Sequence, residues 1–94
     1  MSDQNIEVCI RYTFRGHVQG VGFRWTAVDC SRDLNLKGYV KNMQDGAVEL
    51  KVQGPPENIS SLIDKLSLRM ANNIRSVSKV SEKPHLTQKF CVTY

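Results

Sequence analysis

The chain has 94 residues, of which 40% are hydrophobic and 23% are charged, with a formal net charge of +4. This length and composition predict one globular domain, residues 1–94, whose first residues 1–6 form a flexible N-terminus. The sequence lacks an apolar run long enough to cross a bilayer and lacks the pattern of a secretory signal, so a cytoplasmic location is expected. The basic excess suits an anionic partner, such as a phosphorylated metabolite, a nucleic acid or a membrane surface.

The first predicted elements are a strand and a helix on either side of a glycine-rich stretch. Apolar residues alternate from Val8 to Phe14, which is the period of a strand with one buried face. After the glycines, helical spacing predicts a helix with an apolar stripe formed by Phe23, Ala27, Cys30 and Leu34.

A hairpin and a second helix are predicted next. The strands 37–42 and 47–52 are joined by the turn residues Gln44 to Gly46. Proline is pre-set for the first helical turn, so Pro55 and Pro56 are expected to open the second helix. Its apolar stripe consists of Ile59, Leu62, Ile63 and Leu66.

Two further strands, 74–80 and 90–94, complete the predicted fold. The order is strand, helix, strand, strand, helix, strand, with an extra terminal strand. This order predicts an α+β fold, a ferredoxin-like βαββαβ sandwich in which two helices cover one face of a mixed, mostly antiparallel sheet of four to five strands.

The stretch "RGHVQGVGFRW", Arg15 to Trp25, combines a glycine-rich turn with the start of a helix. Such a turn aims consecutive backbone N–H groups at one point, where they can bind a tetrahedral oxyanion. Arg24 stands where its guanidinium could contact two phosphate oxygens at once. The stretch matches neither the P-loop pattern nor the dinucleotide-binding glycine pattern. Taken alone, it leaves open that the glycines only reverse the chain.

Cysteine and histidine usage argues against a metal. Cys9, Cys30 and Cys91 are widely spaced, and we expect reduced, buried apolar side chains. His17 and His85 are too few, and too far in sequence from other ligand types, for a structural zinc site. The sequence therefore predicts no metal.

Two segments resemble the paired signature of the acylphosphatase family, whose members are small ferredoxin-like enzymes. They are "GHVQGVGFR", Gly16 to Arg24, and "GYVKNMQDGAVEL", Gly38 to Leu50, and the likeness continues to the closing "FCVTY". By this resemblance Arg24 holds the phosphoryl group and Asn42 orients the hydrolytic water. The resemblance also implies that the substrate phosphate is bound by Gly16, His17, Val18, Gln19, Gly20, Val21 and Gly22.

The activity implied by the resemblance is hydrolysis of the carboxyl–phosphate bond of an acyl phosphate, giving a carboxylate and inorganic phosphate. No cofactor is implied, and a phosphate or sulfate ion is an expected ligand. One departure is that Thr26 lies two residues after Arg24, whereas many family members have threonine three residues after, where Ala27 stands here. We expect His17 at the surface. Trp25 lies off the apolar stripe of the helix and could flank the acyl part of the substrate or pack on the sheet edge, and packing is the expectation.

A binding module is the main alternative to an enzyme. RNA-binding domains of this fold display stacking aromatic residues on central strands, and 47–52 contains none, so a nucleic-acid partner is not expected. A non-catalytic phosphate-sensing or regulatory binding module of the same fold remains the alternative. Neither a membrane partner nor an oligomer is expected, because the strand periodicity places the apolar residues in one core.

Overall fold

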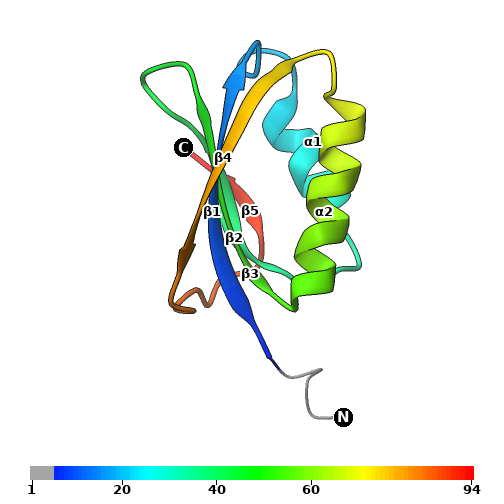
Figure 1. Ribbon diagram of the computed structural model, residues 1–94, viewed down its shortest axis with the longest axis vertical. Helices are drawn as coiled ribbons and strands as arrows, with labels where there is room; N and C mark the ends of the chain where they lie inside the picture. The colour runs from blue at the N-terminus through cyan, green and yellow to red at the C-terminus, as the bar shows by residue number, and fades with distance from the viewer. Residues whose placement is uncertain (1–5) are drawn as a thin grey trace.

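The computed structural model describes residues 6–94, and residues 1–5 of the expected flexible N-terminus lie outside this range. Figure 1 shows the elements in chain order. They are β1 (Val8–Gly16), α1 (Phe23–Cys30), β2 (Lys37–Asn42), β3 (Val48–Gly54), α2 (Pro56–Arg69), β4 (Ile74–Glu82) and β5 (Cys91–Thr93).

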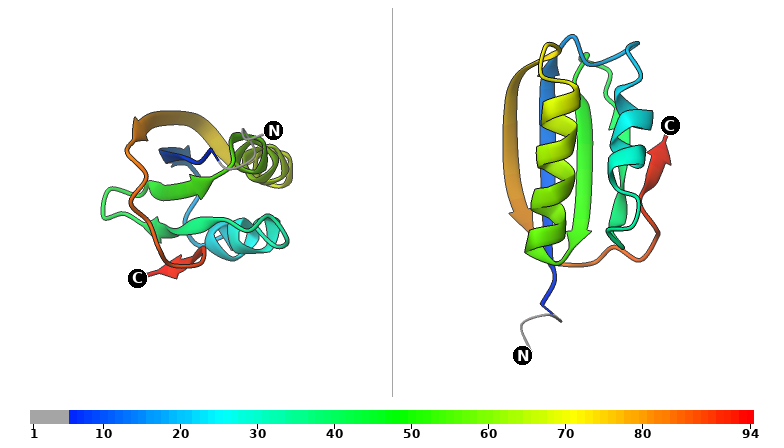
Figure 2. Two further views of the ribbon diagram at one scale, coloured as in Figure 1. Left: turned by 90° about the horizontal axis from the view of Figure 1, so that it is seen from below. Right: turned by 90° about the vertical axis from the view of Figure 1, so that its right-hand side faces the viewer.

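The strands form a single mixed sheet in the order β4-β1-β3-β2-β5. β2 and β5 are parallel, whereas the other neighbouring strands are antiparallel. Both helices cover the same face of this sheet (Figures 1 and 2). The prediction of a ferredoxin-like α+β sandwich is therefore confirmed. Neither described helix is long and apolar enough to span a membrane.

The core lies between the helices and one face of the sheet, as the apolar periodicities predict. The rings of Phe14 from β1 and Phe23 from α1 have centroids 5.1 Å apart. The buried core also includes Ala27, Cys30, Val40, Val48, Leu50, Val52, Ile59, Leu62 and Leu66. Burial of such side chains contributes about 25 cal/mol per Å² of apolar surface. The core thus fixes the positions of the loops at the ends of the elements.

The structure corrects the predicted end of the first helix. α1 ends at Cys30, and the Ser31 N–H bonds back to the Ala27 carbonyl. Asp33 then has a φ of 66°, which a right-handed helix cannot accommodate. Leu34 consequently lies beyond the helix and packs against the core from the following turn.

The terminal strand corrects a second prediction. Cys9 and Cys30 are buried as expected, but Cys91 is exposed. Phe90 is buried and Val92 packs against the core, so the side chain between them points away from it. β5 is an edge strand, and within residues 6–94 its one strand partner is β2.

The face of the sheet opposite the helices carries a polar network around Glu82. Arg11 Nε donates to Glu82 Oε2 at 2.9 Å, and Lys51 Nζ lies 3.0 Å from Oε1. The chain between β4 and β5 crosses this face (Figure 2). It is held there by Gln53 Oε1, which accepts from the backbone N–H groups of His85 and Leu86 at 2.8 and 2.7 Å.

The network makes stability sensitive to acid. The hydrogen bond from Arg11, followed by that from Lys51, lowers the pKa of Glu82 below its ordinary value of 4.5. A lowered folded-state pKa stabilises the fold above the unfolded-state pKa, and this contribution is lost as pH falls through the folded-state value. Urea unfolding should therefore show Glu82→Gln to be less stable than wild type at neutral pH.

The unfolding free energies of wild type and Glu82→Gln should become equal in acid, at a pH below the folded-state pKa of Glu82. Asp64, an exposed carboxylate on α2, provides the control variant Asp64→Asn. A difference between wild type and Glu82→Gln that stays constant from neutral pH into acid would contradict this prediction.

Candidate active site

A run of backbone N–H groups extends over the loop between β1 and α1 and the first turn of α1. Among the described residues, the N–H groups of residues 18–25 find no hydrogen-bond acceptor. Gly22 precedes α1 with a φ of 78°, a left-handed conformation that glycine adopts without strain. The first N–H groups of a helix also have no partner within the helix and carry partial positive charge. This loop can therefore bind an anion through its main chain.

The start of the loop is anchored to the rest of the fold. The His17 N–H donates to the Asn73 carbonyl at 2.9 Å, and Asn73 Nδ2 donates to the His17 carbonyl at 3.0 Å. A Cβ at Gly16 would lie 2.3 Å from that Asn73 carbonyl oxygen, so a side chain cannot fit there. The Val18 side chain is buried in the core, and His17 is exposed as predicted. Val18 can thus contribute only its backbone to the site.

Gln19 joins the loop to the hairpin formed by β2 and β3. Its Nε2 donates to the carbonyls of Met43 at 2.7 Å and Ala47 at 2.8 Å. Both protons of the amide are used in these bonds, so the side chain is not available to a substrate. This contact, which the sequence did not reveal, fixes the loop relative to Asn42, the last residue of β2.

Asn42 presents an unpaired acceptor. Its Oδ1 is buried and has no hydrogen-bond partner among the described residues. A buried acceptor left without a partner costs about 1–3 kcal/mol. The atom is therefore suited to accept a hydrogen bond from a water molecule or a ligand, which is the function that the resemblance implies for this residue.

Arg24 is a cation at the end of the loop. It is the second residue of α1, and its Cζ lies 5.0 Å from the centre of the Tyr94 ring. In the described part of the chain, no carboxylate forms an ion pair with it. Its charge is therefore available to an anion.

Thr26 Oγ1 donates to the Gly22 carbonyl at 2.8 Å. This threonine therefore contacts the loop, although it lies one residue earlier than the threonine of many family members.

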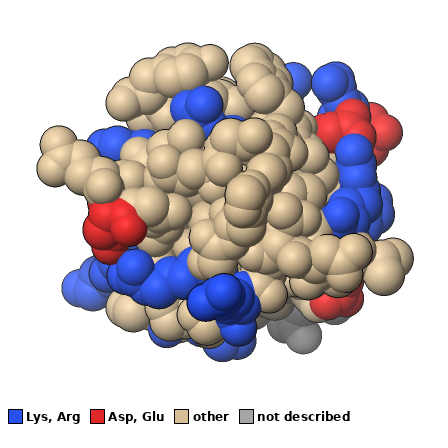
Figure 3. All heavy atoms as spheres, turned by 90° about the horizontal axis from the view of Figure 1, so that it is seen from above, with Lys and Arg blue, Asp and Glu red and all other residues tan. Residues whose placement is uncertain are grey.

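The loop, the start of α1 and the β2–β3 hairpin lie at the same end of the molecule (Figure 1). Viewed onto this end, the surface shows more Lys and Arg atoms than Asp and Glu atoms (Figure 3). The positive surroundings favour the approach of an anionic ligand.

Trp25 is 62% exposed, so the prediction that it packs on the sheet edge is wrong. The first turn of α1 directs its side chain away from the core.

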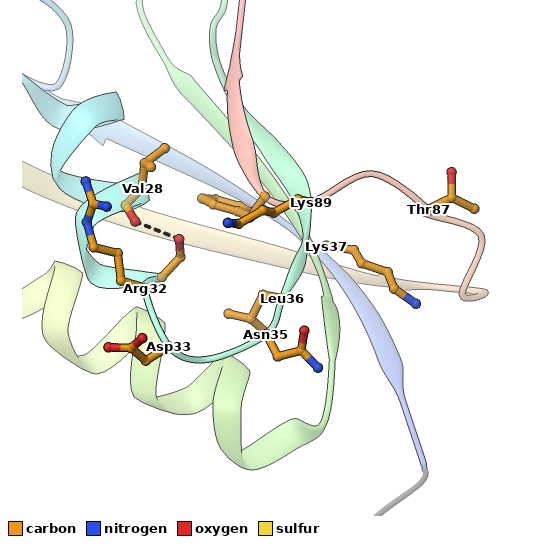
Figure 4. A pocket seen from close by; sticks show the side chains of 10 residues that line it. Val28, Arg32, Asp33, Asn35, Leu36, Lys37, Thr87 and Lys89 are labelled. Carbon is orange, nitrogen blue, oxygen red and sulfur yellow. Dashed lines mark hydrogen bonds between the residues drawn. The ribbon is translucent and has the colours of Figure 1, made fainter.

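A pocket of about 610 Å³ lies at the other end of α1 (Figure 4). None of the predicted site residues lines it. Its lining residues are Val28, Ser31, Arg32, Asp33, Asn35, Leu36, Lys37, Thr87, Lys89 and Phe90. The pocket therefore does not coincide with the run of loop N–H groups.

The structure also corrects the argument about metal ligands. Ligand atoms of Cys9, Glu82 and His85 lie within 4.8 Å of one another, although these residues are far apart in sequence. Distance along the sequence therefore does not show whether these side chains lie close together in the fold. Both Glu82 oxygens already contact Arg11 or Lys51, and these cations oppose a further positive charge.

The Gln19 contact leads to a prediction about geometry. We expect Gln19→Leu to lower kcat for an acyl phosphate about tenfold, because it releases the loop from the hairpin that carries Asn42. Inhibition by inorganic phosphate should change much less, since the backbone donors and Arg24 remain. Gln44→Leu, at an exposed position in the same hairpin, is the matched control. Unchanged kcat in a folded Gln19→Leu protein would show that the contact does not position the site.

Comparisons with known proteins identify the family of the chain. The family model described as Acylphosphatase matches residues 10–92. An acylphosphatase of Synechococcus sp. is 49% identical over 55 residues, which cover 55% of this chain and 44% of that protein. The matched stretch spans about half the length of the curated relatives.

Solved structures are similar over nearly the whole chain. The acylphosphatase of Bacillus subtilis has a TM-score of 0.81 and 27% identity, covering 93% of this chain and 99% of that one. For an acylphosphatase from Coxiella burnetii, the TM-score is 0.78 at 30% identity, with 93% of each chain covered. The extent of the family match shows that the chain belongs to the acylphosphatase family.

Proposed function

We propose that the protein hydrolyses acyl phosphates to a carboxylate and inorganic phosphate. The observation that carries this proposal is the run of unpaired N–H groups at residues 18–25. Arg24, which lacks a carboxylate partner in the described residues, lies within this run. Together these groups offer main-chain donors and one planar cation to the same phosphoryl group. Gly16 and His17 support the loop, and Val18, Gln19, Gly20, Val21 and Gly22 contribute backbone donors.

The proposed reaction needs neither a strong base nor a covalent intermediate, because a carboxylate is a good leaving group. Water attacks phosphorus in line with the scissile bond, and a new bond forms between phosphorus and the water oxygen. The bond to the acyl oxygen breaks, and the carboxylate leaves with its electron pair. The loop amides and Arg24 stabilise the three equatorial oxygens, on which negative charge resides in the transition state.

Asn42 is assigned to the water. Its Oδ1 can accept a hydrogen bond from one O–H of the attacking water and thereby fix the position of the water oxygen. A carboxamide is not a base, so the one proton that the water releases passes to a phosphoryl oxygen or to solvent, and the other stays on the oxygen now bound to phosphorus. The buried, unpaired state of this acceptor favours hydrolysis over phosphate binding alone.

The proposal extends to the state of the protein. We propose a monomer without a cofactor, in which the apolar faces of both helices are already covered by the sheet. Cys9, Cys30 and Cys91 are unpaired thiols, which supports a reducing compartment such as the cytoplasm. Phosphate or sulfate is the expected competing anion, because either presents tetrahedral oxygens to the loop.

The test follows benzoyl phosphate hydrolysis by ultraviolet absorbance, with purified protein and no added metal. We expect turnover that is competitively inhibited by inorganic phosphate and unaffected by EDTA. Phosphate binding without turnover would instead identify a phosphate-sensing module. Inactivation by EDTA, with recovery on adding a metal, would contradict the metal-free mechanism.

A further inference from the structure

Two exposed aromatic residues neighbour Arg24, Trp25 in the sequence and Tyr94 in space. Trp25 follows it on the first turn of α1 and is 62% exposed. Tyr94 is 85% exposed, and its ring contacts the Arg24 guanidinium. We call these two side chains the aromatic rim. Exposed aromatic surface next to a ligand site is typical of a surface that a ligand covers.

The direction of the proposed reaction points the acyl group away from Asn42. In-line attack puts the leaving carboxylate on the side of phosphorus opposite the attacking water. The acceptor proposed to hold that water, Asn42 Oδ1, is buried. The acyl group must therefore extend outward, toward the solvent where the rim residues are exposed.

The contact between Arg24 and Tyr94 brings the proposed phosphate-binding group and an aromatic ring side by side. Arg24 would bind the phosphoryl oxygens while its guanidinium stays stacked on the Tyr94 ring. Trp25 occupies the adjacent helix position, about 100° further around the axis. A planar acyl group that leaves the phosphate site beside Arg24 thus meets aromatic surface, whereas an acetyl group is too short to cover it.

We propose that the aromatic rim binds the acyl part of the substrate and gives the enzyme a preference for aromatic or large apolar acyl phosphates. This inference rests on the proposed hydrolysis. Offset or edge-to-face aromatic contacts stabilise a complex beyond the burial of area alone. The rim therefore determines specificity, while the loop and Arg24 grip the phosphoryl group common to all acyl phosphates.

The kinetic test compares kcat/KM for benzoyl phosphate with kcat/KM for acetyl phosphate. Trp25→Ala should lower this ratio about fivefold, and Trp25→Phe should retain most of it, because a smaller ring still provides a contact surface. Leu68→Ala is the matched control, since Leu68 is an exposed apolar residue on α2 that is 80% accessible. A ratio that is the same in wild type and folded Trp25→Ala would overturn the proposal.

A second measurement does not depend on turnover. Trp25 is the sole tryptophan of the chain, so intrinsic tryptophan fluorescence reports on the rim alone. Benzylphosphonate at saturation should change the emission strongly, whereas methylphosphonate at saturation should change it little. Equal responses to both phosphonates would overturn the proposal.

The two experiments separate this inference from the proposed function. Absence of turnover with both acyl phosphates would contradict the hydrolysis, while the fluorescence response would still show whether the rim contacts an aromatic group. Sedimentation of wild type and Trp25→Ala tests whether a second copy of the chain, instead of a substrate, covers the rim. A wild-type dimer that Trp25→Ala converts to a monomer would show that a second copy of the chain covers the rim, and would overturn the proposal.

Discussion

Replacing Arg24 by alanine is expected to lower kcat/KM for benzoyl phosphate by about 10³-fold or more. The guanidinium is the charged group next to the loop donors, and no carboxylate in the described residues neutralises it. Its removal deprives both the bound phosphoryl group and the transition state of a bidentate cation. Both kcat and the affinity for inorganic phosphate should therefore fall, as measured by steady-state kinetics with phosphate as inhibitor.

Two further substitutions sharpen this test. Arg24→Lys keeps the positive charge but loses the planar pair of donors, so we expect it to recover phosphate binding better than the rate. Arg32→Ala removes an exposed arginine just beyond the end of α1, where it pairs with Asp29, and should change kcat/KM by less than about twofold. A folded Arg24→Ala protein with near wild-type kcat would rule out its assignment to the phosphoryl group.

Local patterns sufficed to predict the elements and half of the candidate site. The period of two in Val8 to Phe14 and the proline start of α2 are properties of neighbouring residues, and the structure has both. The proposal for Arg24 also rests on a local pattern, because a cation after a glycine-rich turn is recognisable within a few residues. Its partner Asn42 required the family resemblance. The spacing alone describes only a polar residue before a turn.

The remaining features depend on contacts that are distant in sequence. Gln19 bonds to carbonyls of residues 24 and 28 positions away, and no local pattern indicates which carbonyls the hairpin turns toward the loop. The exposure of Cys91 follows from the position of β5 at the sheet edge, which the element order did not specify. The sequence favours packing of Trp25 on the sheet edge over contact with the acyl group, but the side chain is 62% exposed on the first turn of α1.

Asn42→Ala separates catalysis from binding. We expect kcat to fall about 10²- to 10³-fold, because the water loses the acceptor that holds it in line with the leaving carboxylate. The affinity for inorganic phosphate should change by less than about threefold, since the loop N–H groups and Arg24 are retained. Asn72→Ala, at an exposed position in the turn between α2 and β4, is the control.

The comparison of Asn42→Ala with Asn42→Asp tests why the residue must be an uncharged acceptor. Aspartate also offers an oxygen to the water, but its negative charge would repel the phosphoryl group at short range. We therefore expect Asn42→Asp to weaken phosphate inhibition, an effect that Asn42→Ala lacks, and to show the largest defect above the carboxyl pKa. If Asn42→Ala were folded and retained full kcat, the attacking water would have to be positioned by another group, and the mechanism proposed for this site would be wrong.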